Sequence, residues 1–217
     1  MSKEINLLII EDDSISANAY ANIVNTLSNI AFSICFAKNC DEAVQQIKHK
    51  KFHLVLLDLQ LPVSKNERYV CGEDLGLLIK KINSKTKIVV LTNVSDSLRI
   101  LNIIKELNPV GFIIKTDIES ESLKKAVTDV LCGKQYYSKT IKANSNKTNL
   151  NGIVIDNFDR QILYHLSMGE KIKDIPKYMA LSKRAIEERI VKLKILFDVK
   201  KGNNYNLVKA AKKAGFI

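Results

Sequence analysis

Five short apolar runs recur through the first part of this chain, and their spacing constrains the fold more than any other feature. The runs cover residues 5–10, 31–36, 53–57, 87–91 and 110–114. The first, third and fourth contain continuous Leu, Ile and Val, which is typical of strands that are buried on both faces of a sheet. The runs therefore predict five strands within a globular core, in keeping with 46% hydrophobic and 26% charged residues.

Helical periodicity fills the stretches between these runs. Two apolar helix faces can be followed, one made by Leu98, Leu101, Ile104 and Leu107 and the other by Leu123, Val127, Val130 and Leu131. Five strands that alternate with helices predict an α/β fold with a doubly wound, parallel, five-stranded sheet. On such sheets, ligands bind at the carboxyl ends of the strands.

The basic charge of the chain is concentrated at its C-terminal end. Residues 1–138 contain 17 basic and 16 acidic side chains, a net charge of +1, whereas residues 153–217 contain 14 basic and 7 acidic side chains, a net charge of +7. Residues 139–152 are rich in Asn, with Ser, Thr, three Lys and a closing Gly, and have little to bury. We therefore predict a domain over 1–138, a linker over 139–152 and a second domain over 153–217. The basic excess indicates either a polyanionic partner for the second domain or a solubilising surface.

The sequence contains no sign of a membrane-bound or secreted protein. No apolar run approaches the roughly 18 residues of a membrane-spanning helix. The first apolar run is too short for the hydrophobic region of a signal peptide. The four cysteines have no Cys-x-x-Cys spacing, so they are expected to be reduced thiols. The sequence therefore predicts a cytoplasmic protein that makes no membrane contact.

Polar residues follow four of the predicted strands. Glu11 and Asp12 follow the first run, Asp58 the third, Thr92 the fourth and Lys115 the fifth. Parallel strands bring these residues to one edge of the sheet, where the carboxylates repel one another unless they share a cation. A hard divalent ion such as Mg²⁺, with oxygen ligands, meets that need, and Lys115 can pair with an anion at the same place. There is no glycine-rich phosphate loop, so a nucleotide site is not indicated.

This pattern resembles the receiver domain of two-component response regulators, which has a flavodoxin-like fold. The matching residues are the acidic pair Glu11 and Asp12, the phosphoacceptor position Asp58, Pro62, the switch hydroxyl Thr92, the switch aromatic Phe112 and Lys115. The resemblance implies that Asp58 accepts a phosphoryl group from a sensor histidine kinase. It also implies that the protein is not an enzyme beyond self-catalysed phosphorylation and dephosphorylation.

The resemblance further implies a role for each residue of the site. Mg²⁺ is held by Asp12, Asp58 and the backbone carbonyl of Gln60, with Glu11 acting through water. Lys115 pairs with the phosphoryl oxygens, Thr92 turns inward to bond one of them, and Phe112 follows. In-line phosphoryl transfer mainly requires positioning and charge neutralisation, which such a site supplies. Val94 has no polar group to position a hydrolytic water, so dephosphorylation is expected to be slow.

One segment departs from the receiver pattern. The family usually has a Gly three or four residues after the Pro, but here nine residues separate Pro62 from Gly72, an insertion of about six. A surface insertion of this length is tolerated because it adds little loop-closure entropy. The alternative is a lid over the site or a contact with a partner.

The second domain is predicted to be small and all-α. Asp156 or Asn157 can begin a first helix that ends at Gly169, a short second helix contains Pro176, and Ser182 can cap a third. A fourth helix covers residues 207–214. Short helix, tight turn and longer helix form the helix-turn-helix arrangement, whose second helix enters the major groove of DNA. The order resembles the LuxR/NarL-type DNA-binding domain.

The exposed positions of the third helix depart from that family. Glu187 and Glu188 would repel phosphates, although a Glu can accept a hydrogen bond from cytosine N4. The candidate DNA-contacting residues are Lys183, Arg184, Glu187, Glu188, Arg189, Lys192 and Lys194, with Lys200 and Lys201 as further phosphate contacts. The alternatives are a solvated charged helix and a protein-binding surface.

Together these patterns predict a phosphorylation-controlled response regulator that binds double-stranded DNA. The resemblance implies that the unphosphorylated receiver covers the third helix, and that phosphorylation releases it and favours a homodimer. The alternative is a phosphorylation-switched module whose degenerate helix-turn-helix binds a protein partner instead of DNA.

Overall fold

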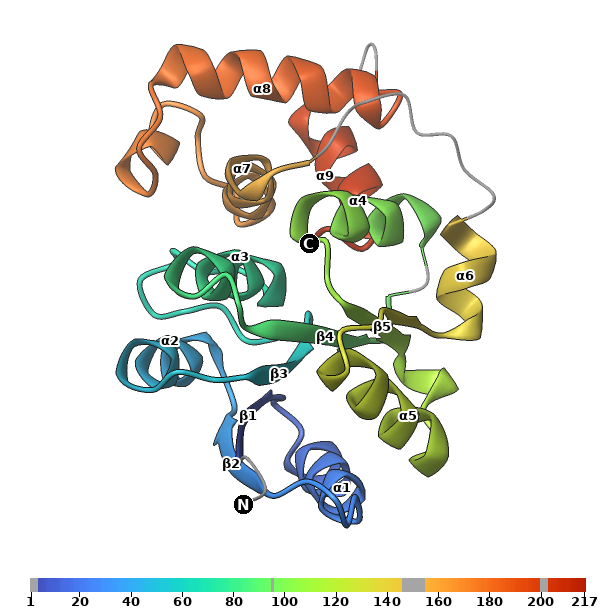
Figure 1. Cartoon of the computed structure of the whole chain (residues 1–217). Coiled ribbons are helices and arrows are strands. Elements are labelled where there is room, and N and C mark those ends of the chain that lie inside the picture. Colours follow the sequence, from blue (N-terminus) through green and yellow to red (C-terminus); the bar gives the residue numbers. More distant parts are fainter. Residues whose placement is uncertain (1–3, 95, 146–154, 200–202) are drawn as a thin grey trace.

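A parallel six-stranded sheet forms the centre of the N-terminal part of the chain (Figure 1). The computed structural model describes residues 4–94, 96–145, 155–199 and 203–217. The strands are β1 (Ile5–Ile10), β2 (Phe32–Ala37), β3 (Leu54–Asp58), β4 (Lys87–Thr92), β5 (Gly111–Ile114) and β6 (Tyr136–Tyr137), in the order β2-β1-β3-β4-β5-β6. The predicted parallel α/β sheet is confirmed, with one strand more than expected. β6 is two residues long, too short to give a period, and pairs with Gly111 and Phe112.

Helices cover both faces of this sheet. On one face lie α1 (Ser14–Asn25) and α5 (Ser120–Leu131), and on the other lie α2 (Cys40–His49), α3 (Gly72–Ile82) and α4 (Ser97–Leu107). Side chains alternate along each strand, so Leu7 and Ile9 pack under α1 and α5 whereas Leu8 and Ile10 pack under the other helices. This two-sided burial explains the continuous apolar runs.

The predicted linker begins with a helix that packs against the sheet domain. After the 3₁₀ turn η1 (Lys115–Asp117) and β6, the chain forms α6 (Lys139–Ser145), and Ile141 on this helix is fully buried beside α4 and β5. The start of the predicted linker, residues 139–145, is therefore helical and packs through one apolar side chain. Residues 146–152 lie outside the described part of the chain.

The buried face of α4 differs from the predicted one. Of the predicted face, Leu101 and Leu107 are buried and Ile104 is partly buried, while Ile100 and Ile103, which the prediction left out, are fully buried in the core. The side chain of Leu98 lies outside the described residues. α4 is covered on its outer side too, so Arg99 and Asn102 are buried as well.

The C-terminal helices form a unit with its own hydrophobic core. They are α7 (Asn157–Ser167), the 3₁₀ turn η2 (Ile175–Lys177), α8 (Lys183–Leu196) and α9 (Asn204–Lys213). Asp156, Ser182 and Asn203 cap α7, α8 and α9 through their side chains. The predicted second helix is reduced to η2, with Pro176 in its first turn, where a missing N–H is tolerated. None of the described helices is long and apolar enough to cross a membrane.

The C-terminal helices contact the sheet domain through α7, not through α8. Figure 1 shows α7 above α3 and beside α4, with α8 on the far side of α7 from α3. Gln161 on α7 donates a hydrogen bond to the backbone carbonyl of Arg68, and Asn102 on α4 bonds the backbone of Ile155. The expectation that the first domain covers the third helix is therefore wrong for this structure. Side chains on the outer face of α8 are exposed, including Val191 at 58%.

We expect Gly72→Ala to destabilise the chain, because a Cβ at this position would lie 2.0 Å from the carbonyl oxygen of Asp58. Relief of such a clash requires backbone movement, with an expected loss of about 1–3 kcal/mol of unfolding free energy. Gly133→Ala is the matched control, since its φ of +84° is strained for Ala but no atom lies within 4 Å. Urea unfolding should show the larger loss for Gly72→Ala, and the opposite ranking would contradict the close approach.

Candidate functional site

Three carboxylates meet where β1 and β3 end. The strand register pairs Ile10 with Leu57, so the next residues, Glu11 and Asp58, leave the sheet side by side. Glu11, Asp12 and Asp58 each offer a carboxylate oxygen within 4.8 Å of the others. Glu11 and Asp58 are each 2% exposed, whereas Asp12 is open to solvent. The structure thus brings together the three acidic residues that the sequence placed at the strand ends, here termed the acidic rim.

Lys115 reaches this rim from the end of β5. Its Nζ lies 2.7 Å from Asp58 Oδ2 and 2.8 Å from Glu11 Oε1. Burial alone would lower the pKa of Lys115, but its hydrogen bonds to Asp58 and Glu11 outweigh burial and raise the pKa. Burial raises the pKa of Glu11, and the hydrogen bond from Lys115 opposes this only in part. Glu11 therefore pairs directly with Lys115 in this structure, a contact that the sequence did not predict.

The acidic rim fits a hard divalent cation. Its donors are three carboxylates, and Lys115 compensates one of their three charges. Lys115 Nζ lies 2.8 Å from each carboxylate oxygen of Glu11, so the charge that remains uncompensated comes from the other two acids. Asp12 faces solvent, where water can complete a coordination shell. Gln60, the fourth predicted metal residue, donates its backbone N–H to Asp58 Oδ1 at 3.0 Å and so orients the carboxylate.

The two predicted switch residues are buried and make no hydrogen bond to the described residues of the acidic rim. Thr92 at the end of β4 is fully buried, and its Oγ1 accepts a hydrogen bond of 3.2 Å from the N–H of Val94. Phe112 is also fully buried and packs edge-on against Tyr137, with ring centroids 6.5 Å apart. Among the described residues, neither side chain bonds Glu11, Asp12 or Asp58.

The inserted segment after Pro62 contacts the C-terminal helices. Besides the bond from Gln161 to the Arg68 carbonyl, Glu67 Oε2 lies 3.7 Å from Nδ1 of His165 on α7. The insertion was interpreted either as a tolerated surface loop or as a lid or partner contact. The described contacts favour a partner contact, and the partner is α7 of the same chain.

The candidate DNA-contacting residues divide into two groups. Lys183, Arg184, Glu187, Glu188 and Lys192 are exposed on α8. Lys183 lies 3.5 Å from Glu187 and Arg184 lies 3.1 Å from Glu188, so each acid is paired with a base one turn earlier.

The second group consists of candidates that are not described as exposed: Arg189, Lys194, Lys200 and Lys201. Arg189 turns back to α7, where its Nη1 lies 2.9 Å from Asp156 and 2.8 Å from Asp159. Its guanidinium is thus occupied within the helical unit. Lys194 is half-buried, and Lys200 and Lys201 lie outside the described residues.

Sequence reasoning missed a second set of buried charges. Arg160 on α7 is the largest fully buried side chain of the described residues, and Glu73 and Asp74 at the start of α3 are buried with it. Arg160 is a charged residue in an amphipathic helix and would be expected on its solvated side. Glu73 and Asp74 lie in the first turn of a helix, where acidic residues are common. No periodic signal could have identified them, because another part of the chain buries them.

Comparison with known families agrees with this geometry. Residues 7–128, more than half of the chain, match the family model described as the response regulator receiver domain. The chain therefore belongs to the response regulator receiver family. No curated protein matches the sequence.

Solved structures extend the similarity beyond the receiver domain. RcsB from Salmonella enterica serovar Typhimurium, bound to promoter rprA in the presence of phosphomimetic BeF3-, aligns with a TM-score of 0.67 over 97% of this chain and 99% of that chain, at 15% identity. A structure of two RcsB dimers bound to two parallel DNAs aligns at 0.61 over 98% and 100%, with 18% identity. A LuxR-family two-component response regulator from Aurantimonas sp. SI85-9A1 aligns at 0.57 over 67% and 97%, with 19% identity. At these identities the shared feature is the fold.

We expect Glu11→Gln to stabilise the chain near neutral pH when divalent cations are absent. Because the pKa of Glu11 is raised above its ordinary value of 4.5, the folded state holds the proton more tightly than the unfolded state. The stability that this group contributes is therefore complete below the ordinary pKa and is lost as the pH rises through the folded pKa. Urea unfolding between about pH 4 and pH 8 should show an advantage of the variant that grows with pH.

The exposed Glu4→Gln variant is the control and should show no such trend. Excess Mg²⁺ should reduce or reverse the advantage of Glu11→Gln, because a cation bound nearby stabilises the ionised carboxylate. An advantage that shrinks as pH rises without Mg²⁺ would contradict the pKa direction.

Proposed function

We propose that this chain is a two-component response regulator in which Asp58 accepts a phosphoryl group from a sensor histidine kinase. The single observation that supports this most is the placement of Asp58, buried between Glu11 and Lys115 at the end of β3. A buried carboxylate with one oxygen held by Lys115 and the other by the N–H of Gln60 is fixed in orientation for in-line attack.

The proposed cofactor is Mg²⁺, held by Asp12, Asp58 and the carbonyl of Gln60, with Glu11 nearby. When bound, the ion supplies neutralisation of the charge on the transferring phosphoryl group. Lys115 adds a second positive charge and moves from pairing Asp58 to pairing the phosphoryl oxygens. Thr92 and Phe112 are proposed to report the added charge by changing their buried packing. No enzymatic output is proposed, since the acidic rim offers a phosphoacceptor and no separate substrate site.

The proposed output is binding to double-stranded DNA through α8, as a homodimer when phosphorylated. The exposed bases Lys183, Arg184 and Lys192 and the net charge of +7 over 153–217 support this. Similar folds that bind DNA in their own structures add support. The i,i+4 pairs Lys183–Glu187 and Arg184–Glu188 leave both acids locally compensated, so they need not exclude phosphates.

We expect phosphorylation on Asp58 and nowhere else, and only with Mg²⁺. A small phosphodonor should add one phosphoryl group to the wild type, measured by intact-mass spectrometry. Asp58→Asn should show no adduct, because the amide is not the nucleophile. Asp12→Asn should need more Mg²⁺, because one charge is removed from a hard-cation site. A stable adduct on Asp58→Asn would overturn the assignment.

We expect the full chain to bind non-specific duplex DNA weakly and with strong salt dependence, because α8 is exposed. With about four phosphate contacts, the slope of log affinity against log salt should be about −3 to −4. Lys192→Ala should flatten the slope by about one unit. Arg189→Ala should leave the slope unchanged, because its guanidinium pairs with Asp156 and Asp159. If no salt-sensitive binding appears near 50 mM salt, where phosphate contacts are strong, the protein-binding alternative replaces DNA binding.

A further inference from the structure

An open cleft of about 650 Å³ lies between the inserted segment and the C-terminal helices, and is here termed the junction cleft. One wall is made by residues 66–69 of the insertion and by α3, and the other by the start of α7 and by residues 177–180. Its volume lies within the range of about 300–1,000 Å³ that small-molecule sites occupy. None of the acidic-rim residues lines it. The junction cleft is therefore separate from the proposed phosphoacceptor site.

The wall that the insertion supplies is held in place by its own hydrogen bonds. Asn66 Oδ1 accepts a bond of 2.9 Å from the Ser64 hydroxyl and one of 3.1 Å from the N–H of Arg68. The N–H of Tyr69 donates to Ser64 Oγ at 3.0 Å, and Glu67 has a left-handed backbone with a φ of +53°. The loop is thus shaped by its own contacts, which lowers the cost of ordering it around a ligand.

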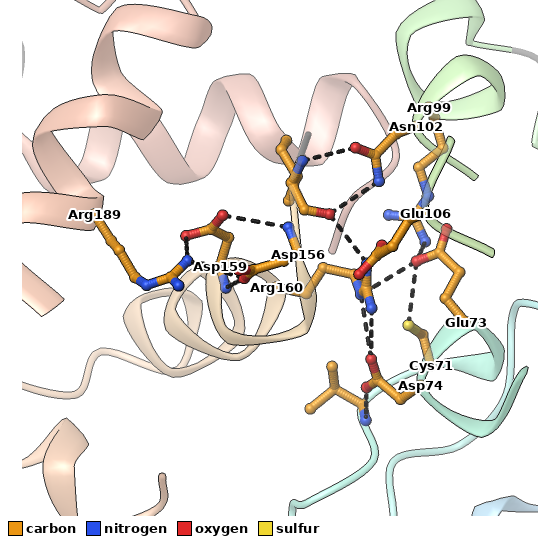
Figure 2. Close-up of polar contacts among 12 residues, drawn as sticks. Cys71, Glu73, Asp74, Arg99, Asn102, Glu106, Asp156, Asp159, Arg160 and Arg189 are labelled. Carbon is orange, nitrogen blue, oxygen red and sulfur yellow. Dashed lines mark hydrogen bonds and ion pairs between the residues drawn. The ribbon is translucent and has the colours of Figure 1, made fainter. Parts of the chain in front are cut away.

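The side chains that line the junction cleft give it a positive charge. Arg68 on the insertion and Lys81 on α3 are exposed, and neither has a carboxylate partner among the described residues. Lys177 on η2 is a third cation, paired within its own turn. Asp74 is the one acid among the described lining residues, and its buried carboxylate is bound by Arg160 at 2.8 Å (Figure 2). Two unpaired cations therefore line a cleft whose one described carboxylate is already neutralised.

Aromatic rings line the same cleft from three segments. Tyr69 comes from the insertion, Phe158 from α7, and Tyr178 directly follows η2. Tyr178 stacks on His165 with ring centroids 4.2 Å apart, and 40% of its surface remains exposed. Aromatic side chains attract a flat ring by offset or edge-on packing, and a guanidinium binds planar anions through two N–H groups. This combination fits a ligand that has both a ring and a negative charge.

We propose that the junction cleft binds a small aromatic anion, a flat ring that carries a phosphate, carboxylate or sulfonate group. Arg68 and Lys81 pair with the anionic group, and the ring packs against Tyr69 and Tyr178. The receiver domain supplies both cations, and the C-terminal helices supply part of the aromatic wall. The ligand therefore contacts both parts of the chain, and its binding does not require the phosphoacceptor role of Asp58.

Two fluorescent probes test the charge requirement in the full-length chain. Anilinonaphthalene sulfonate is an aromatic anion, and phenylnaphthylamine has the same rings without the sulfonate. The sulfonate probe should bind at one saturable site with a Kd of about 100 µM or below, which is ordinary for a ligand of its size. Arg68→Gln and Lys81→Gln should each weaken its binding by about three- to ten-fold, because each removes one positive charge. The neutral probe should bind more weakly, and neither substitution should change its affinity.

Lys65→Gln is the matched control. Lys65 is exposed on the same insertion but does not line the junction cleft. Its replacement should therefore leave the affinity for the sulfonate probe within about two-fold of the wild type. All three variants change exposed side chains, so circular dichroism should show that they fold like the wild type.

Displacement of the sulfonate probe distinguishes the two sources of such a ligand. Adenosine monophosphate displaces the probe if the junction cleft takes nucleotides, and naphthoate displaces it if the cleft takes aromatic acids. Inorganic phosphate, an anion without a ring, should displace it poorly.

The proposal is overturned if the sulfonate probe does not saturate, if it binds no more tightly than the neutral probe, or if Arg68→Gln and Lys81→Gln bind it like Lys65→Gln. It also fails if neither adenosine monophosphate nor naphthoate displaces the probe, because the cleft would then recognise only the apolar surface of the probe. None of these results bears on phosphorylation of Asp58, which intact-mass spectrometry measures separately.

Discussion

The parallel pairing of β1 with β3 is the constraint on which the rest of this structure depends. It sets Glu11 beside Asp58 in a buried position, where two carboxylates cannot both remain charged without a compensating cation. Lys115, at the end of β5, supplies one positive charge within 2.8 Å of both. With Asp12 the rim remains net negative, which is a reason for a divalent cation to bind. The sheet therefore creates the site by placing three carboxylates close together with only one positive side chain, Lys115, to neutralise them.

A second undercompensated set of charges lies directly behind the first. Arg160 lies among the carboxylates of Glu73, Asp74 and Glu106. The first two of these acids follow Gly72, whose close approach to the Asp58 carbonyl only a residue without a Cβ permits. A hydrophobic contact between the two parts of the chain would be more permanent, because its separation would expose apolar surface. A buried, net-negative ion cluster gains hydration when it opens.

Two arginines of the C-terminal helices form ion pairs within the chain and so are not available on the outer side of α8. Arg160 binds the receiver domain, and Arg189 binds the first turn of α7, so both guanidiniums are turned inward. Of the exposed bases on α8, Lys183 and Arg184 are paired one turn along with Glu187 and Glu188, while Lys192 belongs to neither pair. These five exposed residues have a net charge of +1, so the basic character of the outer side of α8 is weaker than composition alone indicates.

The sequence by itself determined the parallel sheet and which residues stand at its carboxyl edge, because burial on both faces gives continuous apolar runs and polar residues of the site follow four of the five predicted strands. Only the tertiary structure decided that α6 packs through Ile141, that Arg160 is buried and that α8 faces outward. Periodicity reports which side of an element is apolar, and it predicts the core well for that reason. It does not report what covers the polar side, so a charge that a distant helix buries looks in the sequence like a charge in water.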